Sequence, residues 1–305
     1  MVGISFLGKK VLFAQHRDEN GEEILQIVGQ IELSSFPDLE YIRRSDFRLD
    51  MVELFGKIKN VVRFPDRQSA SLSIPSNWLH YYLINLEPGL DTEMKREFLT
   101  WEFHQRIGST GESLKPKFYR IQSTDEKEQV LTVGVPAELL DIFVEVADRV
   151  HFTLKIVDID ILSALRALPE LDKKQFVCKY TSQTITITEA YDGDIAAVAQ
   201  FLRKSDDMLQ YSRGTTNDKY ARILQDKLER LNNPDKSVDE PFWVYGNAVP
   251  TSVQSRVQSS EKINIIHPFY GFNVLSGAAK SMSLLEACEF SEVTGVIRQG
   301  KQNLA

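Results

Sequence analysis

Hydrophobic and polar positions follow a layout that occurs twice along the chain. In each half, three strand-like runs come first, and helix-like and strand-like runs then alternate. The first pass begins at Gly3 and the second at Gln175. This layout predicts an α/β protein in which two similar lobes lie side by side and leave a cleft between them.

The first half opens with three expected strands, at 2–6, 11–15 and 24–33. The turn signals Gly8-Lys9-Lys10 and Asp18-Glu19-Asn20-Gly21 separate them, because glycine adopts the positive φ that tight turns require. A helix is predicted next, since apolar residues recur there at helical spacing. These residues are Leu49, Val52, Phe55 and Ile58.

Residues 70–125 predict a small inserted α+β subdomain. It would start with a strand at 70–74 and contain a helix over 91–108. The apolar run at 130–135 follows, and such a run is typical of a strand in a sheet that is covered on both faces. A helix and a strand at 153–157 come next, so a crossover is expected that makes these two strands parallel neighbours.

The second half repeats the order, with strands expected at 176–179, 184–188 and 242–245. A helix over about 276–288 and a short strand at Thr294–Ile297 are expected near the end of the sequence.

The domain prediction places the first lobe at 1–170, including the insertion, and the second at 171–305. The C-terminal segment is a candidate to return to the first lobe. No repeat is visible residue by residue, so the duplication is inferred from the order of elements alone.

Composition narrows the class of protein. Hydrophobic residues make up 42% and charged residues 26% of the chain, as in ordinary soluble globular proteins. The net charge is -7 and no block of Lys or Arg stands out, so nucleic acid is not an expected partner. Charges interrupt every long apolar run, which argues against direct membrane insertion. The start of the chain lacks the pattern of a signal peptide, so a cytoplasmic location is expected.

Cysteine and histidine offer little chemistry. Cys178 and Cys288 lie in apolar surroundings, and neither has a second Cys or a His at metal-binding spacing. They are therefore expected to be buried, reduced thiols rather than a disulfide or metal site. No HxH or HExxH spacing occurs, so no metal is predicted. The histidines are His16, His80, His104, His151 and His267.

Several short motifs resemble those of the actin-like ATPase superfamily and, within it, the PilM family. They occur in the same order over most of the chain. The motifs are Ser71-Leu72-Ser73-Ile74-Pro75-Ser76 with Trp78, Trp101-Glu102, Val133-Gly134-Val135-Pro136, Ile156-Val157-Asp158-Ile159-Asp160, Ala164-Leu165-Arg166-Ala167, Pro268-Phe269 and Thr294-Gly295-Val296-Ile297-Arg298.

The resemblance implies a duplicated ribonuclease-H-like (actin-like) two-lobe fold with a small α+β insertion in the first lobe. PilM-like proteins are cytoplasmic scaffolds of type IV pilus machines, and related modules serve type II secretion. They bind ATP between the lobes. They also dock a short cytoplasmic tail of an inner-membrane protein, PilN, in a groove beside the inserted subdomain. The implied partner is therefore a PilN-like tail, which would hold this protein at the inner membrane.

The two hairpins that should hold the phosphates depart from the superfamily pattern. Hydrolysis in this superfamily needs two carboxylates on facing hairpins, which position Mg²⁺ and the attacking water. The first hairpin usually reads Gly-x-Asp-x-Gly, but here Ser5 stands at the acidic position. The second usually reads Asp-x-Gly-x-x-Thr, but here Lys179 replaces the acid and Thr181 replaces the glycine. At the adenosine end, Gly246 is the one glycine left of a usual pair.

These departures predict a protein without ATP turnover, with no catalytic residue and no cofactor. If nucleotide binding were retained, ATP with Mg²⁺ would be the cofactor and the hairpins would supply the contacts. The candidate residues are Ser5, Gly8, Lys9, Lys179, Thr181, Thr184 and Gly246. Asp158 and Asp160 are a weaker candidate pair for acid–base chemistry, since a helix cap and a strand-end contact explain both more simply.

Aromatic residues are concentrated in the insertion, where they are candidates for partner docking. Strand alternation should turn about half of them into the subdomain's own core, which leaves the rest for an interface. The candidates are Trp78, Tyr81, Tyr82, Trp101 and Phe103.

Three functions remain open at this point. The preferred one is a nucleotide-independent scaffold of a pilus or secretion machine, for which self-association is a further option. The second is an ATPase or small-molecule kinase of the same superfamily with unusual phosphate loops. The third is a binding module of the same fold class without a link to pili.

Overall fold

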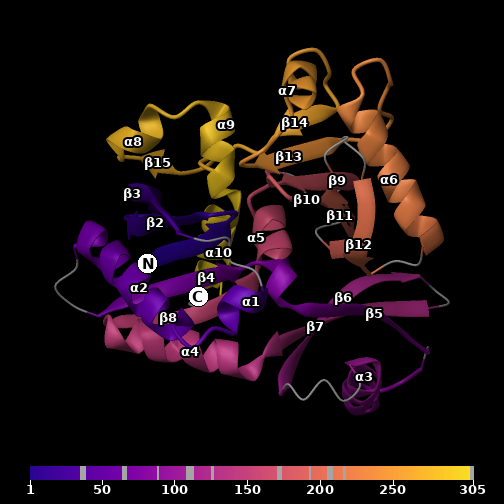
Figure 1. Ribbon diagram of the computed structural model, residues 1–305, viewed down its shortest axis with the longest axis horizontal. Helices are drawn as coiled ribbons and strands as arrows, with labels where there is room; N and C mark the ends of the chain where they lie inside the picture. The colour runs from indigo at the N-terminus through magenta and orange to yellow at the C-terminus, as the bar shows by residue number, and fades with distance from the viewer. Residues whose placement is uncertain are drawn as a thin grey trace.

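The computed structural model describes residues 1–34, 39–63, 67–87, 89–107, 113–124, 127–169, 174–191, 194–204, 209–215 and 218–302. Two six-stranded sheets form the centres of two lobes (Figure 1). The first sheet has the order β15-β3-β2-β1-β4-β8. Its strands are β1 (Val2–Leu7), β2 (Lys10–Glu19), β3 (Glu22–Glu32), β4 (Gln68–Ile74), β8 (Phe152–Ile159) and β15 (Asn273–Val274).

The second sheet has the order β12-β11-β10-β9-β13-β14. In both sheets the first three strands of the lobe run antiparallel, and two later strands join parallel to the first. This shared order confirms the predicted duplicated, ribonuclease-H-like fold. The second set of strands is β9 (Gln175–Tyr180), β10 (Thr184–Tyr191), β11 (Asp194–Arg203), β12 (Leu209–Gly214), β13 (Phe242–Gly246) and β14 (Ile263–Ile265).

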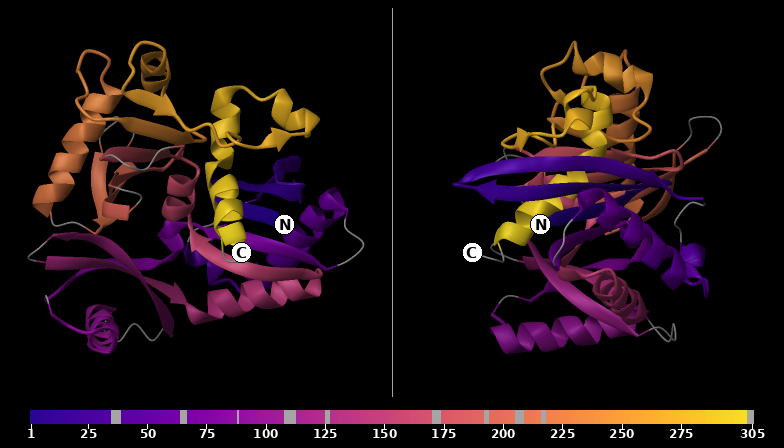
Figure 2. Two further views of the ribbon diagram at one scale, coloured as in Figure 1. Left: turned by 180° about the vertical axis from the view of Figure 1, so that it is seen from behind. Right: turned by 90° about the vertical axis from the view of Figure 1, so that its left-hand side faces the viewer.

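Helices cover both faces of the first sheet (Figure 2). On one face lie α2 (Phe47–Val62) and α4 (Ala137–Arg149), which share a core with β1 and β4. Helix α2 buries a single stripe, because its apolar residues recur at helical spacing. The stripe consists of Phe47, Met51, Leu54, Phe55, Ile58 and Val62.

The other face of the first sheet is covered by the end of the chain. Helix α10 (Ser291–Gln302) packs Val293 and Ile297 beneath β1 and β2, next to α5 (Asp160–Arg166). The strand predicted at Thr294–Ile297 is therefore wrong, since these residues are helical. Their β-branched side chains favour a strand locally, but burial against the sheet stabilises the helix instead. A Cβ at Gly295 would lie 1.6 Å from the Ser163 carbonyl oxygen, so glycine is needed where α10 meets α5.

The insertion is a three-stranded antiparallel sheet of order β5-β7-β6, with α3 on one face. It differs from the expected 70–125, because β4 belongs to the first sheet and β7 belongs to the insertion. The predicted parallel pairing of 130–135 with 153–157 is also wrong, since β8 pairs with β4. The elements are β5 (His80–Leu86), α3 (Thr92–Ile107), β6 (Leu114–Thr124) and β7 (Lys127–Pro136).

The apolar run in β7 led to the wrong strand neighbour for a physical reason. Val130 packs toward α3, whereas Leu131, Val133 and Val135 belong to the core of the first lobe. Both faces of β7 are thus covered, as predicted, but by a helix on one side and a lobe core on the other. A continuous apolar run shows that a strand is covered and does not show which strand is its neighbour.

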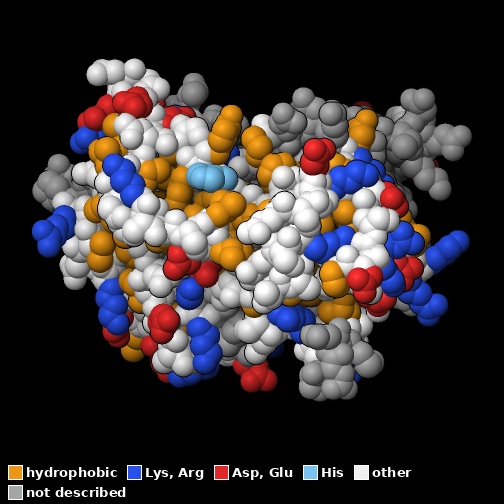
Figure 3. Space-filling model, turned by 90° about the horizontal axis from the view of Figure 1, so that it is seen from above, with side chains coloured by type: hydrophobic (Ala, Val, Ile, Leu, Met, Phe, Trp, Pro, Cys, Tyr) orange, Lys and Arg blue, Asp and Glu red, His pale blue; other side chains and the backbone are white. Residues whose placement is uncertain are grey.

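None of the described helices is long and apolar enough to cross a membrane. On the face seen in Figure 3, positive and negative side chains are interspersed among apolar ones. The remaining helices are α1 (Leu39–Ile42), α6 (Asp218–Asn232), α7 (Thr251–Val257), α8 (Gly277–Lys280) and α9 (Leu284–Ala287), with single 3₁₀ turns at Ser76–Trp78 and Cys288–Phe290.

Candidate functional site

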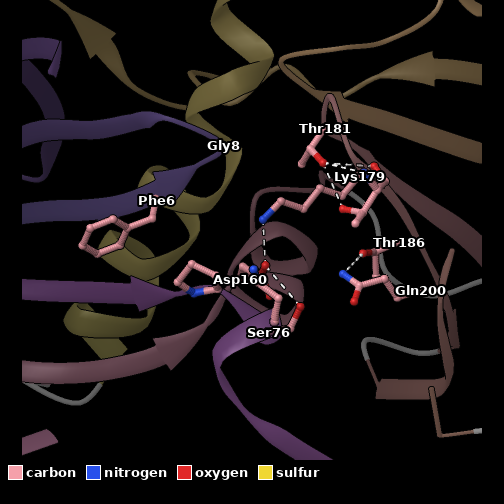
Figure 4. A pocket seen from close by; sticks show the side chains of 11 residues that line it. Phe6, Gly8, Ser76, Asp160, Lys179, Thr181, Thr186 and Gln200 are labelled. Atoms are coloured by element: carbon pink, nitrogen blue, oxygen red, sulfur yellow. Dashed lines mark hydrogen bonds and ion pairs between the residues drawn. The ribbon is translucent and has the colours of Figure 1, made fainter. Parts of the chain in front are cut away.

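The cleft between the lobes brings the two altered hairpins together (Figure 4). Gly8, in the turn after β1, faces Thr181, in the turn after β9. The end of β4 and the start of α5 close the cleft from the first lobe. The lining residues are Phe6, Gly8, Pro75, Ser76, Asn77, Asp160, Lys179, Thr181, Thr184, Thr186 and Gln200.

Lys179 crosses this cleft as a buried cation. Its Nζ lies 2.7 Å from Asp160 Oδ2 and 2.6 Å from Glu292 Oε1. Lys179 belongs to the second lobe, whereas Asp160 and Glu292 begin α5 and α10, which pack on the first sheet. All three side chains are almost inaccessible to solvent. Burial alone would lower the pKa of Lys179, but the two carboxylates outweigh burial and raise it, so the amine stays charged.

Glu292 is the most deeply buried member of this triad. Neither of its carboxylate oxygens has an aligned hydrogen-bond donor among the described residues, although Lys179 is close to one of them. Burial raises the pKa of Glu292 to about 7, because the attraction of Lys179 offsets burial only in part and Asp160 adds repulsion. The Tyr245 hydroxyl also interacts with this carboxylate, and burial raises the pKa of Tyr245 well above its usual range.

In the turn after β9, backbone N–H groups donate hydrogen bonds to acceptors within the same turn. The Thr184 N–H donates to Thr181 Oγ1 at 2.9 Å, and the Thr181 N–H donates to the Thr184 carbonyl at the same distance. The Gln183 N–H donates to Thr181 Oγ1 at 3.4 Å. In phosphate-binding turns such N–H groups face an anion instead. The threonine at position 181 therefore closes the turn on itself.

The hairpin of the first lobe gives no anionic replacement. Ser5 is buried within the sheet, and its hydroxyl has no partner among the described residues. Gly8 has a φ of +62°, and the neighbouring Leu7 carbonyl accepts a 3.5 Å hydrogen bond from Asn247 Nδ2 of the second lobe. Lys9 is exposed and does not line the cleft.

Gly246, expected at the adenosine end of the site, is packed tightly within the second lobe. Gly246 has a φ of +117°, and a Cβ there would lie 2.0 Å from the Tyr180 carbonyl oxygen. The glycine is required by contact between β13 and β9 within the second lobe. Gly246 is not among the residues that line the cleft.

The space between the two hairpins is small. The free volume between the hairpins is about 30 Å³. A water molecule needs roughly 10–15 Å³ measured in this way, so only a few waters have room. The carboxylates nearest the hairpins, Asp160 and Glu292, are both paired with Lys179. Among the described residues there is no cluster of three or more acidic, His or Cys side chains that could bind a metal ion.

Sequence reasoning found part of this site. It identified Gly8, Lys179, Thr181 and Thr184, which the structure places together. It missed Glu292, for which no local signal exists, because α10 lies far along the chain.

For Asp158 and Asp160 a strand-end contact and a helix cap were expected. Asp158 makes the contact at the end of β8, but the N-cap residue of α5 is Ile159 and no side chain caps it. Asp160 accepts a hydrogen bond from the Ile161 N–H and pairs with Lys179. Asp158 pairs with Arg166 and accepts a hydrogen bond from Ser163.

The aromatic docking candidates separate into buried and exposed residues. Trp78 lies in the core of the first lobe, 5.0 Å from the ring of Phe6, and Tyr81 and Phe103 are also buried. These three cannot present a surface to a partner. Tyr82 is half-buried, and Trp101 is 57% exposed on α3.

A larger groove lies between the inserted subdomain and the helices of the first lobe. Its free volume is about 510 Å³, far above that of the interlobe cleft. The groove combines apolar side chains with three arginines. The described lining residues are Ile42, Arg43, Arg44, Ser45, Arg48, Leu49, Ser113, Pro136, Glu138, Leu139 and Ile142.

Comparison with known proteins supports the fold. No protein-family description matches the chain, and no curated protein matches its sequence. A chain of the PilM–PilN type IV pilus biogenesis complex has a TM-score of 0.72 at 12% identity, with 98% of both chains covered.

Two other solved structures are more distant. The cytoplasmic domain of EpsL, an inner-membrane component of the type II secretion system of Vibrio cholerae, has a TM-score of 0.47 at 10% identity, over 99% of this chain and 94% of that one. A Bacteroides thetaiotaomicron protein of actin-like ATPase fold and unknown function has a TM-score of 0.44 at 12% identity, over 89% and 91%. At such identities the PilM–PilN match shows a shared fold and no more.

Proposed function

We propose that this protein is a scaffold that closes its two lobes with an internal ion triad and works without ATP. The observation that supports this most directly is Lys179. This cation stands where the superfamily places a phosphate-loop carboxylate, and it is paired with two buried carboxylates across the cleft. The lobes are thereby joined by the protein's own charges.

The proposal explains several features of the cleft together. A triphosphate carries negative charge and needs Mg²⁺, donors and space. Here Lys179 is already paired with carboxylates. The N–H groups of Thr181, Gln183 and Thr184 bond within their own turn, and the free volume is about 30 Å³. A protein that keeps two lobes but lacks room for nucleotide fits a role in binding other proteins.

The partner that fits best is a short cytoplasmic segment of an inner-membrane protein, comparable to PilN. The shared fold with a chain of the PilM–PilN complex supports this choice, as does the position of the groove beside the inserted subdomain. The exposed Leu49 and the half-buried Ile42 offer apolar contacts, and the arginines favour carboxylates on the partner. The protein would then be cytoplasmic and held at the inner membrane of a type IV pilus or type II secretion-like machine.

Thermal unfolding with and without Mg-ATP tests the absence of nucleotide. A ligand at 100 times its dissociation constant stabilises the folded state by about 2.7 kcal/mol, which raises the melting temperature measurably. We expect no saturable rise with Mg-ATP, Mg-ADP or ATP alone. A saturable rise would reject a nucleotide-free cleft, and phosphate release lost in Lys179→Met would favour the ATPase alternative.

Binding of cytoplasmic segments from inner-membrane assembly proteins that are encoded beside this protein tests the groove. We expect the double variant Arg44→Glu/Arg48→Glu to lose binding by about tenfold or more, because charge reversal replaces attraction by repulsion. The matched control is Arg17→Glu/Arg230→Glu, which also breaks two exposed ion pairs but away from the groove. Equal loss in both variants, or binding of soluble proteins only, would favour a module without a pilus link.

A further inference from the structure

Helix α3 carries aromatic, apolar and acidic side chains on the face opposite the small sheet. Its inner face buries Leu99 and Phe103 against the small sheet. The opposite face leaves Trp101 57% and Met94 52% exposed. Large apolar residues exposed together on one helix face are uncommon unless they meet a partner.

The side chains on this outer face form two neighbouring rows. Glu93, Glu97 and Trp101 follow each other at four-residue spacing, so they lie in one row along the helix. Met94 and Phe98 form the second row, and the Phe98 and Trp101 rings are 6.1 Å apart. Glu93 to Trp101 spans roughly 12 Å, or about two helical turns. The surface is therefore long enough for one short helical segment.

The charged side chains of α3 differ in whether they form ion pairs. Lys95 pairs with Glu128 of the sheet, and Arg106 pairs with Glu102 at 3.0 Å. Glu93 and Glu97 form no ion pair with any described residue. Like charges four residues apart destabilise a helix by a few tenths of a kcal/mol. Glu93 is also favoured by the helix N-terminus, but Glu97 is beyond the first turn and has no such compensation.

We infer that the outer face of α3, defined by Glu93, Met94, Glu97, Phe98 and Trp101, docks a positively charged amphipathic helix of a partner protein. The apolar side of that helix covers Met94, Phe98 and Trp101. Its lysines or arginines pair with the two glutamates, and one of them stacks on the indole of Trp101. Tryptophan at the centre of such a contact typically contributes much of the binding energy.

The charges on this face select this occupant over others. An anionic membrane surface repels Glu93 and Glu97. A second copy of the same face would bring the same glutamates against one another, since a twofold interface pairs identical patches. The surface is also separate from the arginine-lined groove, so it does not depend on the function proposed for that groove.

Titration of the full-length protein with synthetic peptides tests the inference. The probe is an amphipathic Leu/Lys peptide of about 18 residues, long enough for several helical turns. A scrambled Leu/Lys peptide and an amphipathic Leu/Glu peptide are the comparisons. We expect the amphipathic Leu/Lys peptide alone to bind, detected by calorimetry and by a change in tryptophan fluorescence.

Two variants locate the contact. Glu93→Lys/Glu97→Lys should weaken binding by about tenfold or more and create affinity for the Leu/Glu peptide, and Trp101→Ala should weaken it by roughly fivefold or more. The control Asp235→Lys/Glu261→Lys makes the same change in net charge at exposed sites of the second lobe and should bind within about twofold of the unchanged protein. Arg44→Glu/Arg48→Glu should also leave binding unchanged.

Three outcomes overturn the inference. The first is equal loss in the control variant, which would indicate a net-charge effect. The second is equal binding of the scrambled peptide. The third is binding of the protein to anionic vesicles, in the absence of peptide, that is lost in Trp101→Ala. Because the substituted side chains are exposed, the variants should melt within a few degrees of the unchanged protein.

Discussion

Replacing Lys179 by methionine tests the ion triad most directly. Methionine keeps a long apolar side chain and removes the charge, so two buried carboxylates lose their cation. Breaking a buried pair by removing one partner typically costs about 3–5 kcal/mol. For a chain of this size, the melting temperature should fall by on the order of 10 °C. Circular dichroism during heating measures the fall.

The matched control is Lys57→Met. Lys57 pairs with Glu53 at 2.6 Å, a distance close to those of Lys179, but both side chains are more than half exposed. A pair of this kind contributes about 0–1 kcal/mol, so its loss should shift the melting temperature by a few degrees at most. A larger fall of the melting temperature in Lys179→Met than in the control would show that burial of the pair, and not charge pairing alone, determines its contribution to stability.

A compensated variant strengthens the test. In Lys179→Met/Asp160→Asn/Glu292→Gln all three charges are removed, so no buried charge is left without a partner. Replacing a whole buried ion network by neutral groups is often close to neutral in stability. Most of the loss seen in Lys179→Met should therefore be recovered. A loss below about 1 kcal/mol in the single variant, or no recovery in the triple variant, would refute the triad as the link between the lobes.

Three further predictions concern single side chains. Because the pKa of Glu292 rises from 4.5 to about 7 on folding, its contribution to stability is complete below pH 4.5 and is lost as the pH rises to about 7. Unfolding measured across this range should show a fall of roughly 3 kcal/mol that is absent in Glu292→Gln, and equal pH profiles would contradict the shift. Gly295→Ala should destabilise the protein by more than about 2 kcal/mol, because its Cβ would overlap the Ser163 carbonyl, whereas Gly56→Ala, in open space on α2, should be neutral or stabilising by up to about 1 kcal/mol. Burial raises the pKa of both thiols, that of Cys288 to about 12, so a thiol reagent should label Cys178 and Cys288 only after unfolding, and rapid labelling of the native protein would contradict their burial.

The order of the elements was predictable because strands and amphipathic helices have distinct periods. The hairpins around Gly8 and Thr181 were identified from their turn residues, and the structure places them face to face. The helix at the end of the chain was not predictable from Thr294–Ile297 alone. Those residues become helical because Val293 and Ile297 pack beneath β1, a contact between the two ends of the chain.

The candidate site was predictable only on one side. Lys179 was conspicuous because it replaced an expected acid, but nothing near it in sequence indicated its partners. Glu292 lies 113 positions further along, and only the packing of α10 brings it to Lys179. Trp78 and Trp101 show the same limit. The sequence suggested that both belong to the insertion, but Trp78 is buried in the core of the first lobe and Trp101 is exposed on α3.

The path of the chain between the sheets has a consequence for synthesis. The chain leaves the first sheet after β8, builds the second sheet, and only then returns with β15 and α10. On the ribosome, the apolar underside of β1 and β2 therefore stays uncovered until the entire second lobe has emerged. The half that begins to form first is completed last, and in that interval its uncovered apolar surface favours aggregation.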